Sequence, residues 1–222
     1  MKVKYFDLKN KRVFISGGGS GIGATIVEHF CEQNSEVYFI DIDVKSSKKL
    51  ISNIKKKKKR VPKFIDCNIL DIKKLQNIIK NIIANKGPIH CLINSAANDD
   101  RHTTEQVDEK YWENRMGINL KHYFFAAQSV VKGMKKIKSG SIVNLSSVSW
   151  MLGEGDKVVY ETAKSAVIGL TRSFAQEFGK YNIRTNSVIP GSIATERQIK
   201  NWLTPKYKKL ILDSQALKRQ LK

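Results

Sequence analysis

Short apolar runs alternate along the chain with longer segments in which apolar residues recur every three or four positions. The short runs are typical of buried strands, and the longer segments are typical of amphipathic helices. Strands are expected at about 11–15, 36–40, 63–65, 89–93, 141–145 and 182–189. Helices are expected at about 24–34, 45–56, 72–84, 107–116, 120–137 and 158–178, followed by polar helical sequence from 192 to 222. This regular alternation predicts an α/β fold with a mostly parallel sheet.

A single domain is the simplest organisation for these 222 residues, because the chain contains no internal repeat and no linker-like segment. No stretch is long and apolar enough to span a membrane, and the N-terminal residues lack the apolar centre of a signal peptide. Cys31, Cys67 and Cys91 are an odd number of cysteines without metal-ligand spacing. We therefore expect reduced, mostly buried thiols in a cytoplasmic protein.

The formal charge of +20 raises the question of nucleic-acid binding. Only eight of the 40 basic residues are Arg, whereas nucleic-acid readers depend on Arg for bidentate contacts. The excess of Lys comes with many Ile and Asn, which indicates a bias towards A/T-rich codons. The basic run at 55–60 is interpreted as the solvated end of a helix, favoured by the helix dipole. Nucleic acid is therefore not the expected partner.

Three glycines mark the turn from the first expected strand to the first expected helix. Gly17, Gly21 and Gly23 permit a tight turn and a close approach of the backbone to a ligand. The helix that follows presents free N–H groups and the positive end of its dipole to a pyrophosphate. A glycine-rich turn alone can be no more than a flexible loop, but its place between a strand and a helix predicts a dinucleotide site.

Asp41 follows the second expected strand, eighteen residues after Gly23. An acidic side chain there can accept hydrogen bonds from the adenosine ribose hydroxyls, and it would repel a 2′-phosphate. The sequence therefore predicts NAD as the cofactor in preference to NADP. Lys45 lies nearby and would soften that preference.

Ser147, Tyr160 and Lys164 are candidate catalytic residues. Tyr160 and Lys164 are four residues apart, so on a helix their side chains share one face. A nearby cation favours the phenolate, and we expect it to make Tyr160 a proton acceptor near neutral pH. Ser147 ends a strand-like run thirteen residues earlier and could hydrogen-bond the same reacting oxygen. A Tyr-x-x-x-Lys pair alone is a weak signal, because it occurs by chance in many helices.

Several motifs in order make the chain resemble the classical short-chain dehydrogenases/reductases. The segments 16–23, 117–120 and 190–195, together with the Ser, Tyr and Lys above, match the pattern of that family. The resemblance implies a single-domain Rossmann-type doubly wound sheet over residues 1–222, with Asn119, Ser147, Tyr160 and Lys164 as the catalytic tetrad. It implies that the cofactor is held by Gly17, Ser20, Gly21, Ile22, Gly23, Asp41, Ile42, Asn68, Ile69, Asn94, Ala96, Tyr160, Lys164, Pro190, Gly191, Ile193 and Thr195.

A narrower resemblance is to NAD-dependent aldose dehydrogenases acting on D-xylose, D-galactose or L-fucose. It is carried by the segments 98–102, 149–150, 196–198 and 202–205. This resemblance implies that Tyr160 removes the proton of an anomeric hydroxyl while hydride passes to NAD, which leaves a lactone. It also implies that Asn119 holds a water that links Lys164 to solvent. The candidate sugar contacts are Asn98, Asp100, Ser147, Trp150, Glu154 and Trp202. No metal site is expected, because the His residues are scattered.

Three departures from the family pattern stand out. Ser95 and Ala97 replace an amide and a glycine, and Asn68 stands where an aspartate usually receives the adenine amino group. The chain also ends before the further helix and last edge strand of the family. If it is complete, we expect the strand at 183–189 to be an exposed apolar edge, with lower stability or altered assembly.

Two other functions remain open from the sequence. One is an NADPH-dependent reductase of 3-oxoacyl thioesters or another ketone, whose acidic carrier the basic surface would attract. The other is a non-catalytic protein that binds NAD or nucleic acid on the same fold. Asp41 disfavours the first and the full tetrad disfavours the second. Apart from a monosaccharide substrate, the expected partner is a second copy of the chain, in a dimer or tetramer.

Overall fold

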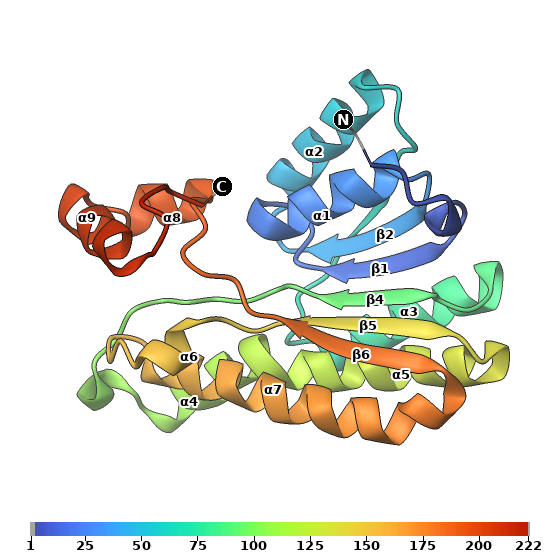
Figure 1. The fold of residues 1–222 in the computed structure, drawn as a ribbon. Helices are drawn as coiled ribbons and strands as arrows, with labels where there is room; N and C mark the ends of the chain where they lie inside the picture. The colour runs from blue at the N-terminus through green and yellow to red at the C-terminus, as the bar shows by residue number, and fades with distance from the viewer. Residues whose placement is uncertain (1–2, 222) are drawn as a thin grey trace.

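Six parallel strands form the central sheet of the computed structural model, which describes residues 3–221 (Figure 1). The strands are β1 (Arg12–Ser16), β2 (Glu36–Asp41), β3 (Lys63–Asp66), β4 (Cys91–Asn94), β5 (Gly140–Leu145) and β6 (Ile183–Val188). Their order across the sheet is β3-β2-β1-β4-β5-β6. The order reverses between β1 and β4, and in such sheets a ligand crevice opens at that point, at the carboxyl ends of the strands. The predicted doubly wound parallel fold is confirmed.

Helices cover the two faces of the sheet (Figure 1). They are α1 (Gly21–Glu32), α2 (Val44–Lys56), α3 (Ile72–Lys86), α4 (Glu109–Met116), α5 (His122–Ile137), α6 (Ser149–Leu152), α7 (Val158–Phe178), α8 (Glu196–Asn201) and α9 (Pro205–Ser214). Shorter helical turns are η1 (Phe6–Leu8), η2 (Thr104–Gln106), η3 (Gly117–Lys121) and η4 (Gly179–Tyr181). None of the helices within residues 3–221 has the length and apolarity needed to cross a membrane.

Two hydrophobic clusters, one on each face, hold the layers together. On one face Phe14, Leu92 and Ile142 of the sheet pack against α3, α5 and α7. On the other face Val13 and Phe39 pack against α1 and α2. Successive side chains of a strand point to opposite faces, so strands covered on both sides are apolar throughout. This is why the strands stood out in the sequence as short continuous apolar runs.

Side-chain caps explain where the expected and observed helix boundaries differ. Asp108 accepts a hydrogen bond from the N–H of Tyr111 at 2.6 Å, so α4 begins at Glu109 rather than at 107. The polar segment expected to be helical from 192 to 222 is broken into α8 and α9. Thr204 caps α9 through the N–H of Tyr207, and Pro205 occupies the first helical position, where a missing N–H costs nothing.

β6 is the last strand of the sheet order among the described residues, as expected. Ile183 and Thr185 face the core, while Arg184 and Asn186 are exposed. Exposed apolar side chains are confined to the carboxyl end of the strand and the residue after it, where Val188 is 50% exposed and Ile189 is 40% exposed. The expected apolar edge is thus polar over most of its length.

The basic run after α2 lies against α1. The ammonium of Lys57 binds Glu28, and that of Lys59 lies 2.5 Å from a carboxylate oxygen of Glu32. Arg60 donates to the backbone carbonyl of Asn34 at 2.8 Å. Part of the run therefore makes intramolecular contacts with α1 and the turn after it, rather than forming only the solvated helix end expected from the sequence.

Candidate active site

A cavity of about 920 Å³ lies at the carboxyl ends of the strands. Its walls come from the segments that follow each of the six strands, from the first turns of α7, and from the α8–α9 segment. Figure 1 shows α8 and α9 standing apart from the helical layers, beyond these strand ends. The chain therefore places α8 and α9 next to the cavity, apart from the two helical layers.

The glycine turn at the floor of the cavity is packed too tightly for side chains. Gly17 has φ +70°, and a Cβ atom added there would lie 2.6 Å from the Cα atom of Ala96. A Cβ atom on Gly23 would lie 1.9 Å from the carbonyl oxygen of Gly17. Ser20 precedes α1 without capping it through its side chain, so the first N–H groups of α1 are left for an anion. These features fit the pyrophosphate of a dinucleotide.

Asp41 lines the same cavity at the end of β2. One carboxylate oxygen accepts from the N–H of Gly19 at 2.8 Å and the other from the N–H of Asp43 at 2.9 Å. The backbone thus holds the carboxylate in one orientation. Asn68 also lines the cavity, but its side-chain oxygen already accepts from the N–H of Leu70 at 3.0 Å. Its expected role towards adenine stays a prediction.

Most of the other residues predicted to hold a cofactor lie around the cavity. Those on its walls are Gly17, Ser20, Ile22, Gly23, Ile42, Ile69, Ala96, Tyr160, Lys164, Pro190, Gly191, Ile193 and Thr195. Gly21 is not on the wall; it begins α1 with φ +53°. Asn94 is fully buried behind the wall, where it donates to Asn144 of β5 at 2.9 Å. Asn94 therefore supports the sheet rather than facing the cavity.

Buried hydrogen bonds fix α7 against β5. The hydroxyl of Ser146 donates to the carbonyl of Lys164 at 2.7 Å, and the ammonium of Lys164 donates to the carbonyl of Leu145 at 2.7 Å. Further along, Asn144 donates to the hydroxyl of Thr171 at 3.0 Å. A buried polar network with these partners is rigid. The register of α7, and with it the height of its cavity-facing side chains, is set by these contacts.

Ser147 and Tyr160 meet on the cavity wall. Both residues line the cavity, and Ser147 acts on the phenol of Tyr160 by lowering its pKa. The hydroxyl of Ser147 lies 2.9 Å from that of Ser149. The ammonium of Lys164 lies 5.6 Å from the centre of the Tyr160 ring. The structure thus brings together three of the four residues predicted to be catalytic.

The protonation expected from the sequence is wrong in one respect. Burial raises the pKa of Tyr160 to about 12, and the opposing, smaller effect of Ser147 lowers it. Burial also lowers the pKa of Lys164 to about 7. Removing both groups from water disfavours their charged forms, and this outweighs the attraction between ammonium and phenolate that the spacing suggested. Tyr160 is therefore a neutral phenol near neutral pH in this structure.

Asn119 lies in η3, a single π-helical turn of the kind often found at functional sites. Its side-chain oxygen accepts from the N–H of Asn98 at 2.8 Å, and its amide donates to the carbonyl of Asn98 at 3.0 Å. The side chain therefore ties the helix to the loop after β4. The predicted role of Asn119 in holding a water stays a prediction.

The six predicted sugar contacts divide into two groups. Asn98, Ser147 and Glu154 line the cavity. Asp100, Trp150 and Trp202 are not on its wall. Asp100 instead pairs with Arg115 at 3.2 Å, and Trp202 packs under the guanidinium of Arg101, 5.1 Å from the ring centre.

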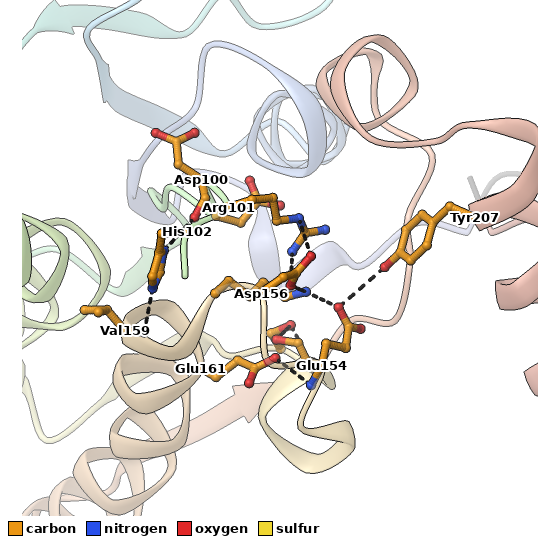
Figure 2. A network of polar contacts seen from close by, with 12 residues as sticks. Asp100, Arg101, His102, Glu154, Asp156, Val159, Glu161 and Tyr207 are labelled. Atoms are coloured by element: carbon orange, nitrogen blue, oxygen red, sulfur yellow. Dashed lines mark hydrogen bonds and ion pairs between the residues drawn. The ribbon is translucent and has the colours of Figure 1, made fainter. Parts of the chain in front are cut away.

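Three cationic side chains on the cavity wall were missed from the sequence. Arg101 pairs with Asp156 at 3.3 Å, and Lys157 binds both Glu154 and Asp156. Figure 2 shows how this network joins the loop after β4 to the start of α7, and how Tyr207 of α9 donates to Glu154 at 3.4 Å. Arg101 and Asp156 are 55 residues apart, so no local sequence signal identifies that pair. Lys157 and its two partners lie on one turn, but the sequence does not show that this turn faces the cavity.

The third missed cation is Arg197 of α8. Its guanidinium lies 3.3 Å from a carboxylate oxygen of Asp99 and 2.7 Å from one of Asp100. Gln198 donates to Asp99 at 2.6 Å. Together these contacts hold α8 against the loop after β4. Each cation on the cavity wall among the described residues that is not catalytic thus has a carboxylate partner.

The described cysteines and acidic residues do not form a metal site. Within residues 3–221, His, Cys, Asp and Glu side chains form no group of three that could hold a metal ion. Cys31, Cys67 and Cys91 are free thiols, the first two buried and the third half-buried. Burial raises the pKa of Cys31 and of Cys91 to about 12, so both are unreactive near neutral pH.

Comparisons with known proteins agree with this geometry. A probable galactose dehydrogenase from Rhizobium meliloti is 39% identical over 215 residues, which cover 97% of this chain and 84% of that protein. A D-xylose 1-dehydrogenase from Caulobacter vibrioides is 41% identical over 217 residues, which cover 98% of this chain and 85% of that protein. A short-chain dehydrogenase/reductase structure from Mycobacterium ulcerans shares the fold, with a TM-score of 0.89 at 20% identity over 96% of this chain and 78% of the other.

The family model for short chain dehydrogenases matches residues 11–205. That range includes the glycine turn, Asp41, Ser147, Tyr160 and Lys164. The chain therefore belongs to the short chain dehydrogenase family, whose members are oxidoreductases that use a nicotinamide cofactor.

Proposed function

We propose that the protein is an NAD-dependent dehydrogenase that oxidises the anomeric carbon of an aldose to a lactone. The observation that carries this proposal is the charge balance of the cavity wall. Arg101, Lys157 and Arg197 each bind a carboxylate of the protein itself. Apart from the candidate catalytic Lys164, no cation that residues 3–221 place on this wall is left unpaired for an acidic substrate. The paired charges offer donors and acceptors to a neutral substrate rich in hydroxyls.

The printed names of two relatives support the same substrate class. One is named a galactose dehydrogenase and the other a D-xylose 1-dehydrogenase. A 3-oxoacyl thioester on an acidic carrier would instead need unpaired cations at the mouth of the cavity. The charge balance therefore favours a sugar over the thioester, although the net charge of the chain is +20.

The cofactor we propose is NAD. Gly17, Gly23 and the N-terminus of α1 would hold the pyrophosphate, and Asp41 would accept from the ribose hydroxyls. When bound, NAD would supply the hydride acceptor that oxidation of the sugar requires. The fixed carboxylate of Asp41 would repel a 2′-phosphate, which supports NAD over NADP.

Ser147, Tyr160 and Lys164 would carry out the proton chemistry. The hydroxyl of Ser147 would hydrogen-bond the anomeric oxygen, and the oxygen of Tyr160 would take its proton. Because burial raises the pKa of Tyr160 to about 12, the phenolate is scarce at neutral pH and needs a positive charge beside it as it forms. A protonated Lys164 nearby would stabilise the phenolate as it forms, and the same lysine would hold the nicotinamide ribose.

We also propose that the chain is one catalytic domain that works in the cytoplasm and self-associates. Three free thiols and no disulfide among the described residues support a reducing compartment. Gel filtration with light scattering tests the self-association.

The experiment that tests the function measures NADH formation by absorbance, with a panel of aldoses and with NADP in parallel. Turnover of xylose, galactose or fucose with NAD supports the proposal. The variant Tyr160→Phe should lose turnover while it still binds NAD, whereas Tyr5→Phe, at an exposed tyrosine that is not on the cavity wall, should behave as the parent. A protein that oxidises no aldose but reduces a 3-oxoacyl thioester with NADPH would overturn the proposal.

A further inference from the structure

His102 links the loop after β4 to the start of α7, as Figure 2 shows. Its side chain is buried, with 7% of the residue exposed. Its backbone N–H donates to the carbonyl of Asp156 at 2.8 Å, and its Nε2 atom accepts from the backbone N–H of Val159 at 3.3 Å. One residue of the loop thus contacts α7 and the turn before it at two points.

The partners of the imidazole determine its tautomer. A backbone N–H can only donate, so the Nε2 atom that faces Val159 must be unprotonated. The proton is therefore on Nδ1, which lies 3.2 Å from the carbonyl of Asp100 and 3.0 Å from the hydroxyl of Tyr111. The Tyr111 ring also packs edge-on against the imidazole, at 5.0 Å between centres. The surroundings of His102 thus fix a neutral ring with an acceptor aimed at α7.

The first turn of α7 needs such an acceptor. Lys157 stands at the N-cap position with φ −160°, and its side chain makes no capping hydrogen bond. The N–H groups of a first helical turn have no partner within the helix. The N–H of Val159 is one of these, and Tyr160 is the next residue. Whatever binds this N–H acts directly beside the candidate proton acceptor.

We propose that His102 is a positioning residue, which caps α7 from a distant loop and so holds Tyr160 at its place on the cavity wall. The proposal rests on the proposed role of Tyr160. It assigns the imidazole no contact with substrate or cofactor. His102 acts through the hydrogen bond that its Nε2 atom accepts from Val159, and its Nδ1 side serves to keep that atom free of a proton.

The chain allows a matched pair of variants. A Gln side chain can place its amide oxygen where Nε2 lies, whereas an Asn side chain ends where Nδ1 lies and cannot reach Val159. We would compare His102→Gln with His102→Asn, and use His29→Gln as a control, because the side chain of His29 is 69% exposed on α1. For each protein we would measure kcat and KM with the aldose, the dissociation constant of NAD, and hydrogen exchange of peptides covering 157–162 by mass spectrometry.

We expect the Asn variant to lose about tenfold in kcat and to exchange the first turn of α7 about fivefold faster, with NAD binding unchanged. The Gln variant should stay within about twofold of the parent in both measurements, as should the His29 control. Equal losses in the Gln and Asn variants would overturn the proposal, since ring packing rather than the acceptor would then matter. An Asn variant with parental exchange and kcat would also overturn it.

Two features keep this test independent of the proposed substrate and of the folding of the variants. If no aldose is oxidised, the exchange data alone decide whether His102 caps α7, while the proposed function fails separately. In the unmodified protein, nitrogen NMR of the labelled imidazole should show a proton on Nδ1 and none on Nε2. A ring protonated on Nε2 would contradict the cap even if the Asn variant did not fold.

Discussion

The ammonium of Lys164 donates to the hydroxyl of Tyr123 across 2.9 Å, in the fully buried space between α5 and α7. Tyr123 in turn donates to the carbonyl of Leu145 at 3.0 Å, so its oxygen is left as an acceptor for the lysine. The ammonium also lies 5.1 Å from the centre of the Tyr123 ring. Both hydrogen-bond partners of the Lys164 side chain are acceptors, which oppose the effect of burial on its pKa.

Tyr123→Phe should lower the pKa of Lys164 below its present value of about 7, because one of two acceptors for the ammonium is lost. Less of the lysine is then charged at neutral pH. We therefore expect kcat to fall by about tenfold, which corresponds to an activation free energy higher by roughly 1.4 kcal/mol. Stability should fall by about 1–3 kcal/mol, since two buried polar groups each lose a partner. Denaturant unfolding and the pH profile of kcat measure these effects. Tyr5→Phe is the control, and an unchanged profile in Tyr123→Phe would contradict the prediction.

Asp41→Asn should reduce the preference for NAD. The amide keeps the size of the carboxylate but loses the charge that would repel a 2′-phosphate. We expect kcat/KM with NAD to fall by about tenfold and activity with NADP to rise, since a charged hydrogen bond contributes about 1.5–3 kcal/mol. Kinetics with the two cofactors measure the ratio. Asp71→Asn is a matched control, because Asp71 also accepts a backbone N–H, from Lys74 at 2.9 Å, away from the cavity wall. Parallel changes in both variants would indicate a general effect on stability.

The sequence predicted the strands and the glycine turn well, because their signals are local. Continuous apolar runs result from burial on both faces of the sheet. Glycine is required at positions 17 and 23 because a Cβ atom there would overlap neighbouring backbone atoms. Ser147 and Tyr160 could be paired for a similar reason. Ser147 follows the end of β5 and Tyr160 lies in the first turn of α7, and the connection from β5 through α6 to α7 keeps these two points close together.

The charge states and the contacts of the cavity wall could not be predicted in this way. The pKa values of Tyr160 and Lys164 depend on burial by elements far away in sequence, such as α5. Asp100 and Trp202 were expected to contact sugar. Asp100 instead forms an ion pair with Arg197, and the Trp202 ring packs against the guanidinium of Arg101. The arginine that binds Asp100 from α8 is 97 residues away, which no local pattern can reveal.

Arg197→Gln should weaken substrate binding more than stability. The guanidinium joins α8 to Asp99 and Asp100 beside the cavity, but its side chain is 47% exposed. Exposed ion pairs contribute about 0–1 kcal/mol to folding, so Tm should move by no more than a few degrees. Without these contacts α8 is held less firmly over the cavity, and we expect KM for the aldose to rise about fivefold to tenfold. Steady-state kinetics check this, with Arg172→Gln, an exposed residue of α7, as the control. A larger loss of Tm than of substrate binding would argue against this role of α8.

His122 should make the protein sensitive to acid. It is fully buried at the start of α5, with its Nε2 atom 3.4 Å from the hydroxyl of Ser16, and burial lowers its pKa from 6.5 to about 3. In the unfolded chain His122 therefore binds a proton below about pH 6.5, whereas in the folded chain it stays unprotonated down to about pH 3. Stability should decrease as the pH falls through this window, by roughly 1.4 kcal/mol per pH unit from this group.

His122→Gln removes the titration but keeps a polar group near Ser16. Between about pH 7.5 and pH 4.5 the parent should therefore lose roughly 2–3 kcal/mol more unfolding free energy than the variant. Denaturant unfolding at a series of pH values measures the two curves, with His29→Gln as the exposed control. The variant can be less stable than the parent at neutral pH, because its packing against Tyr123 differs. The decisive quantity is the slope, and parallel curves for parent and His122→Gln would show that His122 does not cause the loss of stability in acid.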